Sequence, residues 1–223
     1  MKNRIVALSA LWLVVISTVR AQNVDFGLTA GFQFSTGYTV GNSLPNSSIR
    51  TGILAGGHAS LFLNERIVIK SALLFSQKGM TMTREEDDER RIIANDYLTL
   101  PIVAKLYITK GFHVQIGPQA SYLVTSNSKL GDRKFNLKRA DYLKPIDFGV
   151  VFGLGYEFKS TFTFALNFDV GLINVIDNRE TFEAHMDGVL EWRGIQGNLP
   201  ERLSNTTFQF VFGYNFTKNR SAF

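Results

Sequence analysis

Apolar and polar residues alternate along most of the chain with a period of two. The pattern starts with Phe26, Leu28, Ala30, Phe32 and Phe34, which are separated by polar residues and glycine. Because successive side chains of a strand point to opposite faces, this pattern predicts a strand with one apolar face. Uncharged apolar sets at alternate positions predict seven more strands, within residues 53–63, 67–75, 98–108, 112–122, 146–158, 162–172 and 208–216.

The connections between these segments alternate between short and long. Tight turns are predicted at 64–66, 109–111 and 159–160, and long loops at about 39–50, 79–95, 125–142 and 175–204. This places all short turns and both chain ends at one end of the fold. The pattern predicts an all-β protein, an eight-stranded antiparallel up-and-down transmembrane β-barrel with periplasmic turns and external loops. Each segment has at least 9 residues, which reaches the roughly 9–11 that a strand needs to cross a membrane.

Alternation alone does not say which face is inside, because a soluble lipocalin-like barrel alternates too. Here the polar face is rich in glycine, as at Gly27, Gly31, Gly117, Gly153 and Gly213, which suits a narrow lumen. A surface in water would carry more Lys and Glu. The apolar face is unbroken and rich in Phe, and the last strand alternates aromatics as terminal strands of outer-membrane barrels do. We therefore expect the apolar face to meet lipid.

Composition narrows the function classes further. The chain has 223 residues, 19 Phe, 19 Gly and no Cys. The absence of Cys excludes disulfides, thiolate metal sites, a Cys nucleophile and a lipidated Cys. Hydrophobic residues at 45% and charged residues at 19% exclude a disordered chain.

The first residues predict a signal peptide. A basic start at Lys2 and Arg4 precedes an uncharged apolar run, residues 5–19, and then Val19-Arg20-Ala21. The run falls short of the roughly 20 residues of a membrane-spanning helix. We expect a signal peptide at 1–21 and the barrel domain at 22–223, exported to the outer membrane of a Gram-negative bacterium. Losing Lys2, Arg4 and Arg20 lowers the formal net charge from +5 to +2, so a nucleic-acid partner is not expected.

Ionisable residues on the inward parity are the candidate site. Because isolated charges are costly in a narrow lumen, we expect a polar network that fills the barrel. Its predicted members are Asp25, His58, Lys70, Lys105, Glu157 and Asp169. Asp25, Lys70, Lys105 and Glu157 lie near the short-turn end. The alternative use of these charges is an ion path.

Two loop features are candidate contacts on the external side. The acidic run Glu85, Glu86, Asp87, Asp88 and Glu89 is interpreted as a solvated loop tip, or alternatively as a contact for divalent ions or lipopolysaccharide. Trp192 lies in the last and longest loop, a length typical of a functional or disordered segment. We expect a protein partner to bind through the external loops.

Acid–base residues in the last loop give the enzyme hypothesis little support. Glu183, His185 and Asp187 could act with Ser204, but nothing in the sequence fixes their geometry. The prediction is no enzyme, no catalytic residue, no cofactor and no metal.

Several short motifs together resemble one family. They are Ser76-Gln77-Lys78-Gly79, Tyr97-Leu98-Thr99-Leu100-Pro101, Gly117-Pro118-Gln119, the Gly153–Phe158 segment GLGYEF and Gly171-Leu172-Ile173-Asn174. The set is similar to the PorT-like outer-membrane β-barrel family of small porin-like proteins, over essentially the whole mature chain. The resemblance implies a barrel and, from the founding member, an association with type IX secretion. Outer-membrane lipid, lipopolysaccharide and the barrel-assembly machinery are the expected partners.

Three function hypotheses follow. The first is a structural or accessory barrel for secretion or surface interaction, the second a narrow channel for small solutes, and the third an outer-membrane enzyme.

Two prolines predict a local defect in the wall. Pro101 and Pro118 lie inside predicted strands, where proline cannot donate a ladder hydrogen bond. The turn at 109–111 centres the hairpin so that the two prolines lie almost opposite each other. We predict one bulge or gap in the ladder there, with Pro101 pointing inward and Pro118 outward.

Overall fold

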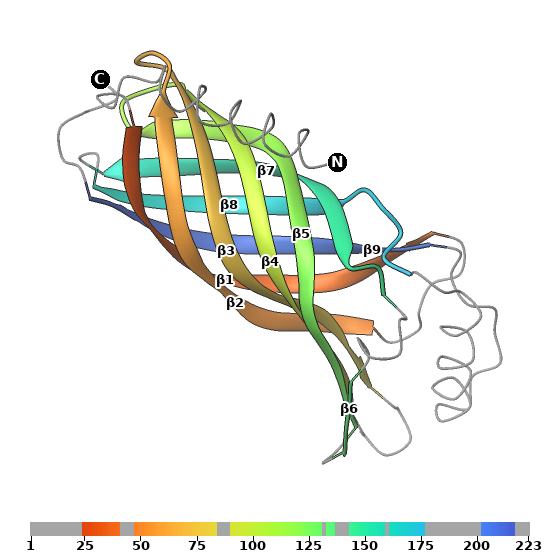
Figure 1. The fold of residues 1–223 in the computed structure, drawn as a ribbon. Helices are drawn as coiled ribbons and strands as arrows, with labels where there is room; N and C mark the ends of the chain where they lie inside the picture. Colours follow the sequence, from red (N-terminus) through yellow and green to blue (C-terminus); the bar gives the residue numbers. More distant parts are fainter. Residues whose placement is uncertain are drawn as a thin grey trace, which may run out of the picture.

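The chain folds into one closed antiparallel barrel of eight long strands plus one short strand, as Figure 1 shows for the computed structural model. The structure describes residues 24–40, 47–83, 90–130, 133–136, 143–158, 161–176 and 202–216. The strands are β1 (Val24–Val40), β2 (Ser47–Phe62), β3 (Ile67–Thr83), β4 (Arg90–Tyr107), β5 (Phe112–Leu130), β6 (Arg133–Asn136), β7 (Ile146–Phe158), β8 (Phe162–Gly171) and β9 (Arg202–Asn215). In these residues no helix is long and apolar enough to cross a membrane.

Every barrel strand pairs with its two neighbours around a ring. The order is β1, β2, β3, β4, β5, β7, β8 and β9, and β9 pairs with β1 to close the ring. Closure leaves no open edge in the wall, which is what a lipid environment requires. The predicted eight-stranded up-and-down barrel is confirmed.

Short turns and the two ends of the sheet lie at one end of the barrel, which we call the turn side (Figure 1). The Phe216 amide donates to the Phe26 carbonyl at 2.9 Å there, so β1 begins beside the end of β9. The Asn64 side chain accepts from the Arg66 and Ile67 amides at 2.8 and 2.9 Å, which closes the β2–β3 turn. In the β4–β5 turn Gly111 has φ +83°, a left-handed conformation that favours glycine. The opposite end, with the long connections, is the loop side.

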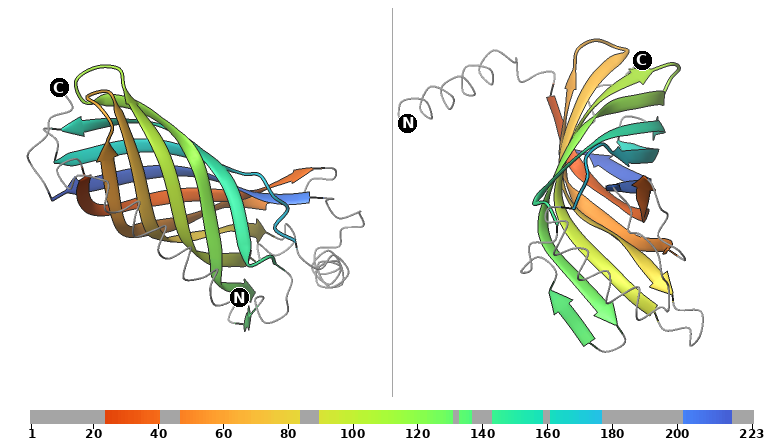
Figure 2. Two further views of the ribbon diagram at one scale, coloured as in Figure 1. Left: turned by 45° about the horizontal axis from the view of Figure 1, so that its top comes forward. Right: turned by 90° about the vertical axis from the view of Figure 1, so that its right-hand side faces the viewer.

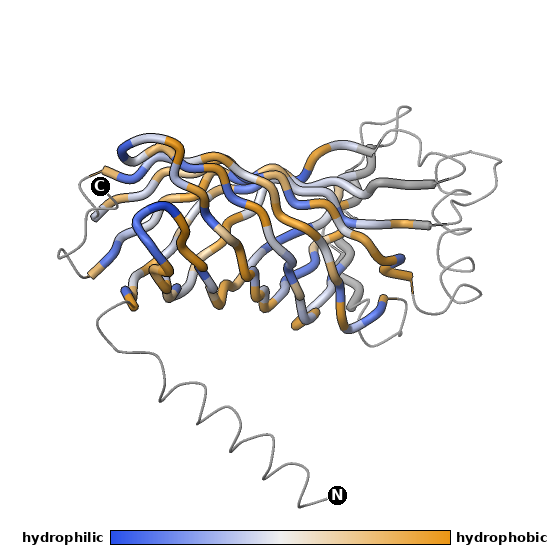
Figure 3. Tube along the Cα trace, turned by 90° about the horizontal axis from the view of Figure 1, so that it is seen from above, coloured by the Kyte–Doolittle hydropathy of each residue, from blue (hydrophilic) through white to orange (hydrophobic). Residues whose placement is uncertain are grey.

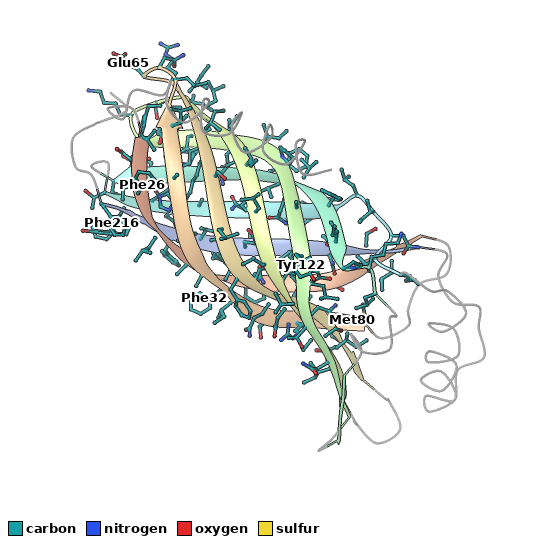
Figure 4. The ribbon with its side chains drawn as sticks, viewed as in Figure 1. Phe26, Phe32, Glu65, Met80, Tyr122 and Phe216 are labelled. Atoms are coloured by element: carbon teal, nitrogen blue, oxygen red, sulfur yellow. The ribbon has the colours of Figure 1, made fainter. Side chains whose placement is uncertain are left out.

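The apolar face points outward. Phe26 and Phe32 are 59% and 61% exposed, whereas Gln33 beside them is 0% exposed. Figure 3 shows hydrophobic and hydrophilic positions alternating along the strands, and Figure 4 shows Phe26, Phe32 and Phe216 directed away from the barrel. The arrangement is that of a protein whose solvent is lipid outside and whose own side chains fill the inside.

Aromatic ring contacts are concentrated on β9 and its two neighbours, β1 and β8. Neighbouring rings meet across β9 and its partners, as in Phe34–Phe210 at 6.0 Å, Phe164–Phe212 at 5.5 Å and Phe162–Tyr214 at 5.3 Å between centroids. Such tilted and edge-to-face contacts stabilise cross-strand pairs by about 0.5–1.5 kcal/mol each.

Several strands continue beyond the predicted loop boundaries. β3 runs to Thr83, β4 starts at Arg90 and β5 runs to Leu130, so the loops predicted at 79–95 and 125–142 are too long. β6, which pairs with the end of β5, was not predicted. Past the membrane a strand has no lipid face, so the ladder can continue without the apolar alternation that revealed the strands.

This continuation makes the barrel uneven in height. β4 and β5 have 18 and 19 residues, but β7 and β8 have 13 and 10. At about 3.4 Å per residue, the difference is about 30 Å between β5 and β8. We call residues 90–97 of β4, 123–130 of β5 and strand β6 the extended wall. Figures 1 and 2 show it projecting past the rest of the loop side.

The wall is interrupted at the two prolines, as predicted. The β4–β5 ladder breaks between Pro101↔Gln119 and Ala104↔Ile116, a gap that contains Pro118. The β3–β4 ladder breaks between Ser71↔Ile102 and Leu74↔Thr99, a gap that contains Pro101. The register does not shift at either gap, so the bulge alternative is wrong. The register shift of this hairpin lies between Asp96 and Tyr97 instead.

The two missing donors face different ladders. The Tyr107 amide bonds toward β3 and the Ile108 amide toward β5, so odd positions of β4 bond to β3. Pro101 therefore removes a donor toward β3, and Pro118 removes one from β5 toward β4. Gly117 lets β4 and β5 approach closely here, because a Cβ would lie 2.0 Å from the Ile102 carbonyl oxygen. The prediction of a single defect is corrected to two adjoining gaps on either side of β4.

Candidate functional site

Inward side chains fill the lumen in three zones. The loop-side cluster consists of Lys78, Tyr97, Gln119, Asp147, Asp169 and Asn205. The apolar belt consists of Leu54, Ala72, Leu74, Ala165 and Val211. The turn-side cluster consists of His58, Lys70, Lys105, Tyr107, His113 and Glu157. On β3 the belt residues lie between Lys70 and Lys78, so the belt separates the two charged zones.

An ion pair crosses the lumen in the loop-side cluster. The Lys78 ammonium lies 2.6 Å from Asp169 Oδ2, and both side chains are nearly inaccessible to solvent, at 1% and 2%. β3 and β8 are opposite strands of the ring, so the pair spans the full width of the barrel. Gln119 donates to the same oxygen at 2.7 Å, and the Lys78 ammonium lies 5.8 Å from the Tyr97 ring centroid. These contacts compensate the desolvation of both charges.

Asn205 makes a second link across the lumen. Its amide donates to Asp147 Oδ2 at 2.8 Å and to the Tyr97 hydroxyl at 3.4 Å, from β9 to the opposite strand β4. Asp147 Oδ1 and the Thr207 hydroxyl are buried with no partner in the described part of the chain. With the ion pair, this link gives the loop-side cluster two side-chain bridges across the lumen.

The turn-side cluster is organised around Glu157. The Tyr107 hydroxyl donates to Glu157 Oε2 at 2.5 Å. The positive charges of Lys70 and Lys105 are attracted by Glu157 and repel each other. The Glu157 carboxylate is therefore oriented by the Tyr107 hydroxyl as well as by the two ammonium groups.

A hydrogen-bonded chain runs around the same end of the lumen. Lys70 donates to the Thr29 hydroxyl at 3.4 Å, Thr29 contacts His58 Nδ1 at 2.8 Å, and His58 Nε2 contacts Asn215 Oδ1 at 2.8 Å. His113 contacts the Gly111 carbonyl at 3.3 Å, but its Nε2 is buried without a partner in the described residues.

A cavity of about 40 Å³ lies between the turn-side cluster and the belt. Its polar lining includes Thr29, Lys70, Lys105, Gln115 and Thr163, and its apolar lining includes Leu74 and Val211. A cavity of this size has room for a few water molecules at about 10–15 Å³ each.

The lumen has an apolar belt between two charged zones. In the described residues, no three His, Asp or Glu side chains are placed to hold a metal ion. The two cross-lumen links lie on the loop side of the belt.

The structure places the predicted lumen residues in two separate zones. Lys70, Lys105, Glu157 and His58 lie in the turn-side cluster, and Asp169 lies on the other side of the belt. Asp25 is buried at the turn side, in register with Ser60 and Lys70. The external candidates Glu85, Glu86, Asp87, Asp88, Glu89 and Trp192 lie outside the described residues, as do residues 1–21 and the Glu183, His185 and Asp187 set.

The sequence prediction of the site missed Tyr97 and Tyr107, which make central hydrogen bonds, and the amides Gln119 and Asn205. All four share the inward parity, so that signal was present. Selecting charged residues alone passed over them.

The chain is similar to one known family and to several solved structures. The family model described as "Outer membrane protein beta-barrel domain" matches residues 20–177. Neisserial surface protein A is similar with 11% identity and a TM-score of 0.51, over 86% of this chain and 97% of that one. The attachment invasion locus protein Ail of Yersinia pestis has 9% identity and a TM-score of 0.43, over 87% and 99%. Outer membrane protein W of E. coli has 15% identity and a TM-score of 0.40, over 88% and 100%. No curated protein matches the chain.

Proposed function

Because the chain belongs to the outer membrane protein β-barrel domain family, we propose that it is a closed, non-enzymatic barrel that holds a protein-binding surface outside the membrane. That surface is the extended wall with its neighbouring external loops. The partner is a protein of a secretion or surface-interaction system.

The observation that carries this proposal is the Lys78–Asp169 pair across the full width of the lumen. A pore would need a continuous wet path, and here the ion pair and the apolar belt lie across it. A barrel that is filled by its own side chains serves as an anchor for what it carries.

The uneven height of the barrel supports the location of the binding surface. β5 extends past Tyr122, its last partner position with β7, and β6 then folds back along it. Residues held in a paired sheet above the membrane form a rigid platform, whereas a loop of the same length would lose more entropy on binding. β6 is also an edge strand, because in the described residues it pairs with β5 alone. In β-augmentation, an extended segment of a partner pairs with such an edge.

The resemblance to the PorT-like family, carried by motifs such as Gly117-Pro118-Gln119, supports the association with protein secretion. Lipid on the Phe-rich face, lipopolysaccharide around the loop side and the barrel-assembly machinery are the other partners that this function implies. The expected orientation places the turn side in the periplasm.

Co-purification tests the binding surface. Residues 131–142, which include β6, are replaced by a Gly-Ser linker of equal length, and the tagged barrel is isolated from outer membranes. The matched control replaces residues 41–46 in the same way. Loss of a partner in the first variant and its retention in the control support the proposal. Identical partners in wild type and both variants contradict it.

Conductance in planar bilayers tests the alternative of a narrow channel. The polar cavity beside Lys70 and Lys105 is the observation that favours a channel. A closed anchor gives no current steps. Reproducible steps that change when Leu74 is replaced by Ala favour the channel.

A further inference from the structure

The lumen contains a cavity whose lining is suited to a negative ion. We propose that it binds one small inorganic monovalent anion of the chloride class, held between the ammonium groups of Lys70 and Lys105.

The two lysines come from adjacent strands and border one space. Lys70 lies on β3 and Lys105 on β4, and both line the 40 Å³ cavity. Lys105 is 3% exposed, so water outside the barrel does little to solvate its charge. Two ammonium groups that border one small cavity repel each other, and a negative ion between them offsets that repulsion.

The nearest carboxylate does not fill this role completely. Glu157 attracts both lysines, but it is not part of the cavity lining, and Tyr107 donates to its Oε2. Asp25 lies in register with Ser60 and Lys70, and it does not line the cavity either. An anion inside the cavity would place a negative charge directly beside both lysines.

The lining supplies neutral donors beside the charges. The hydroxyl groups of Thr29 and Thr163 border the cavity, and Lys70 already donates to Thr29 at 3.4 Å. Gln115 is oriented by its hydrogen bond to Asn167 at 2.5 Å. Hydroxyl groups can turn their hydrogens toward an anion, so this part of the wall can adapt to it.

Gly213 leaves the space between two of these donors open. A Cβ at this position would lie 3.7 Å from Thr163 Oγ1 and 3.8 Å from Lys70 Nζ. These are ordinary contact distances, so Ala fits the backbone but takes up part of the cavity. Its nearest neighbour would be Thr163 Cβ at 3.4 Å.

Charge determines the chemical class. A volume of about 40 Å³ has room for a halide ion with a few waters, at about 10–15 Å³ for each water centre. Bromide, which has the same charge as chloride, should therefore compete for the site.

The test uses the folded full-length barrel in detergent micelles. Chloride binding is read from the broadening of the ³⁵Cl magnetic-resonance line, at constant ionic strength with gluconate as the replacing anion. Thermal unfolding is followed in the same solutions, since a ligand that binds only the folded state raises the melting temperature. Saturable broadening that bromide displaces, with a melting temperature that rises with chloride and not with gluconate, is the expected result.

Two variants and two matched controls locate the site. Lys105→Met removes one ammonium group, and Lys110→Met removes an exposed charge in the β4–β5 turn as its control. Gly213→Ala fills part of the cavity without changing charge, and Gly57→Ala on the outer face is its control, because a Cβ there meets only the Gly27 carbonyl at 3.8 Å. The specific broadening should fall at least several-fold in the first variant of each pair and stay unchanged in both controls.

Other outcomes overturn the proposal. Broadening that is equal in all five proteins shows non-specific ion association. Absence of any chloride effect in wild type shows that water and a neutral lysine fill this part of the lumen. If Lys105→Met fails to fold, the Gly213→Ala and Gly57→Ala pair still decides.

Discussion

Removing one member of the cross-lumen ion pair should destabilise the barrel strongly, whereas removing both should not. Lys78→Met leaves the Asp169 carboxylate buried without its cation, and Asp169→Asn leaves the Lys78 ammonium without its anion. The pair is 2.6 Å apart, and the two side chains are 1% and 2% exposed, so little water can replace the lost partner. A buried charge left in this way costs about 3–5 kcal/mol.

The double variant Lys78→Met/Asp169→Asn contains no unpaired charge. Its Asn can still accept from Gln119, which now donates to Asp169 at 2.7 Å. We expect its free energy of unfolding to lie within about 2 kcal/mol of wild type, because a buried pair and a well-packed neutral replacement are often equivalent. The two single effects should therefore be far from additive, with a coupling energy of about 3 kcal/mol or more.

The assay is reversible urea unfolding of the barrel in lipid vesicles, followed by Trp and Tyr fluorescence and by the mobility difference between unheated and boiled protein. Wild type, both single variants and the double variant form one thermodynamic cycle. Additive single effects, or single variants within about 1 kcal/mol of wild type, would show that Lys78 and Asp169 are solvated and that the lumen is open to water.

Three further predictions concern the wall and the orientation. An epitope inserted beside Asp88 or Glu183 should be accessible to antibody on intact cells and a C-terminal tag should not; the opposite labelling would refute the orientation. Phe32→Lys, at a position that is 61% exposed, should cost about 2–4 kcal/mol of stability in lipid, and a cost near zero would contradict a lipid-facing surface. Gly117→Ala should impair assembly, measured as the folded fraction in SDS gels, because its Cβ would lie 2.0 Å from a backbone oxygen of the adjacent strand. The control Gly57→Ala should assemble normally.

The sequence was sufficient to predict the architecture because lipid imposes a strict period on each strand. Alternating segments such as the one around Phe32 define the number of strands. Tight turns such as 109–111 define the end of the barrel at which the short connections lie. The loop-side ends of the strands could not be predicted in this way. Met80 and Met82 alternate with Thr81 and Thr83, but this alternation covers only two apolar positions. Ile92, Ile93 and Ala94 are consecutive and do not alternate, so neither segment was distinguished from a loop.

The partners inside the lumen were harder to predict than the lumen itself. Parity places both Lys78 and Asp169 on the inward face, but their contact depends on the stagger of β3 relative to β8 around the closed sheet. That stagger is a property of barrel closure and of the register of every intervening hairpin. The proline gaps show the same distinction. The centre of the β4–β5 hairpin predicted correctly that the two prolines lie close together. Which ladder each proline interrupts depends on whether the amides at odd positions of β4 point toward β3 or toward β5.

The pairing of β1 with β9 has a kinetic consequence. It joins residues such as Gly27 and Asn215, the most distant in sequence of any strand pair in the ring, so this seam carries the largest loop-closure entropy. Contacts that can form only after the ring has closed contribute little to the transition state for folding. The aromatic pair across this seam, Phe34–Phe210, should therefore slow the opening of the barrel more than it accelerates its formation. The closed barrel would then persist because it opens slowly, as well as because the folded state has the lower free energy. Such kinetic stability suits a protein that stays in its membrane after assembly.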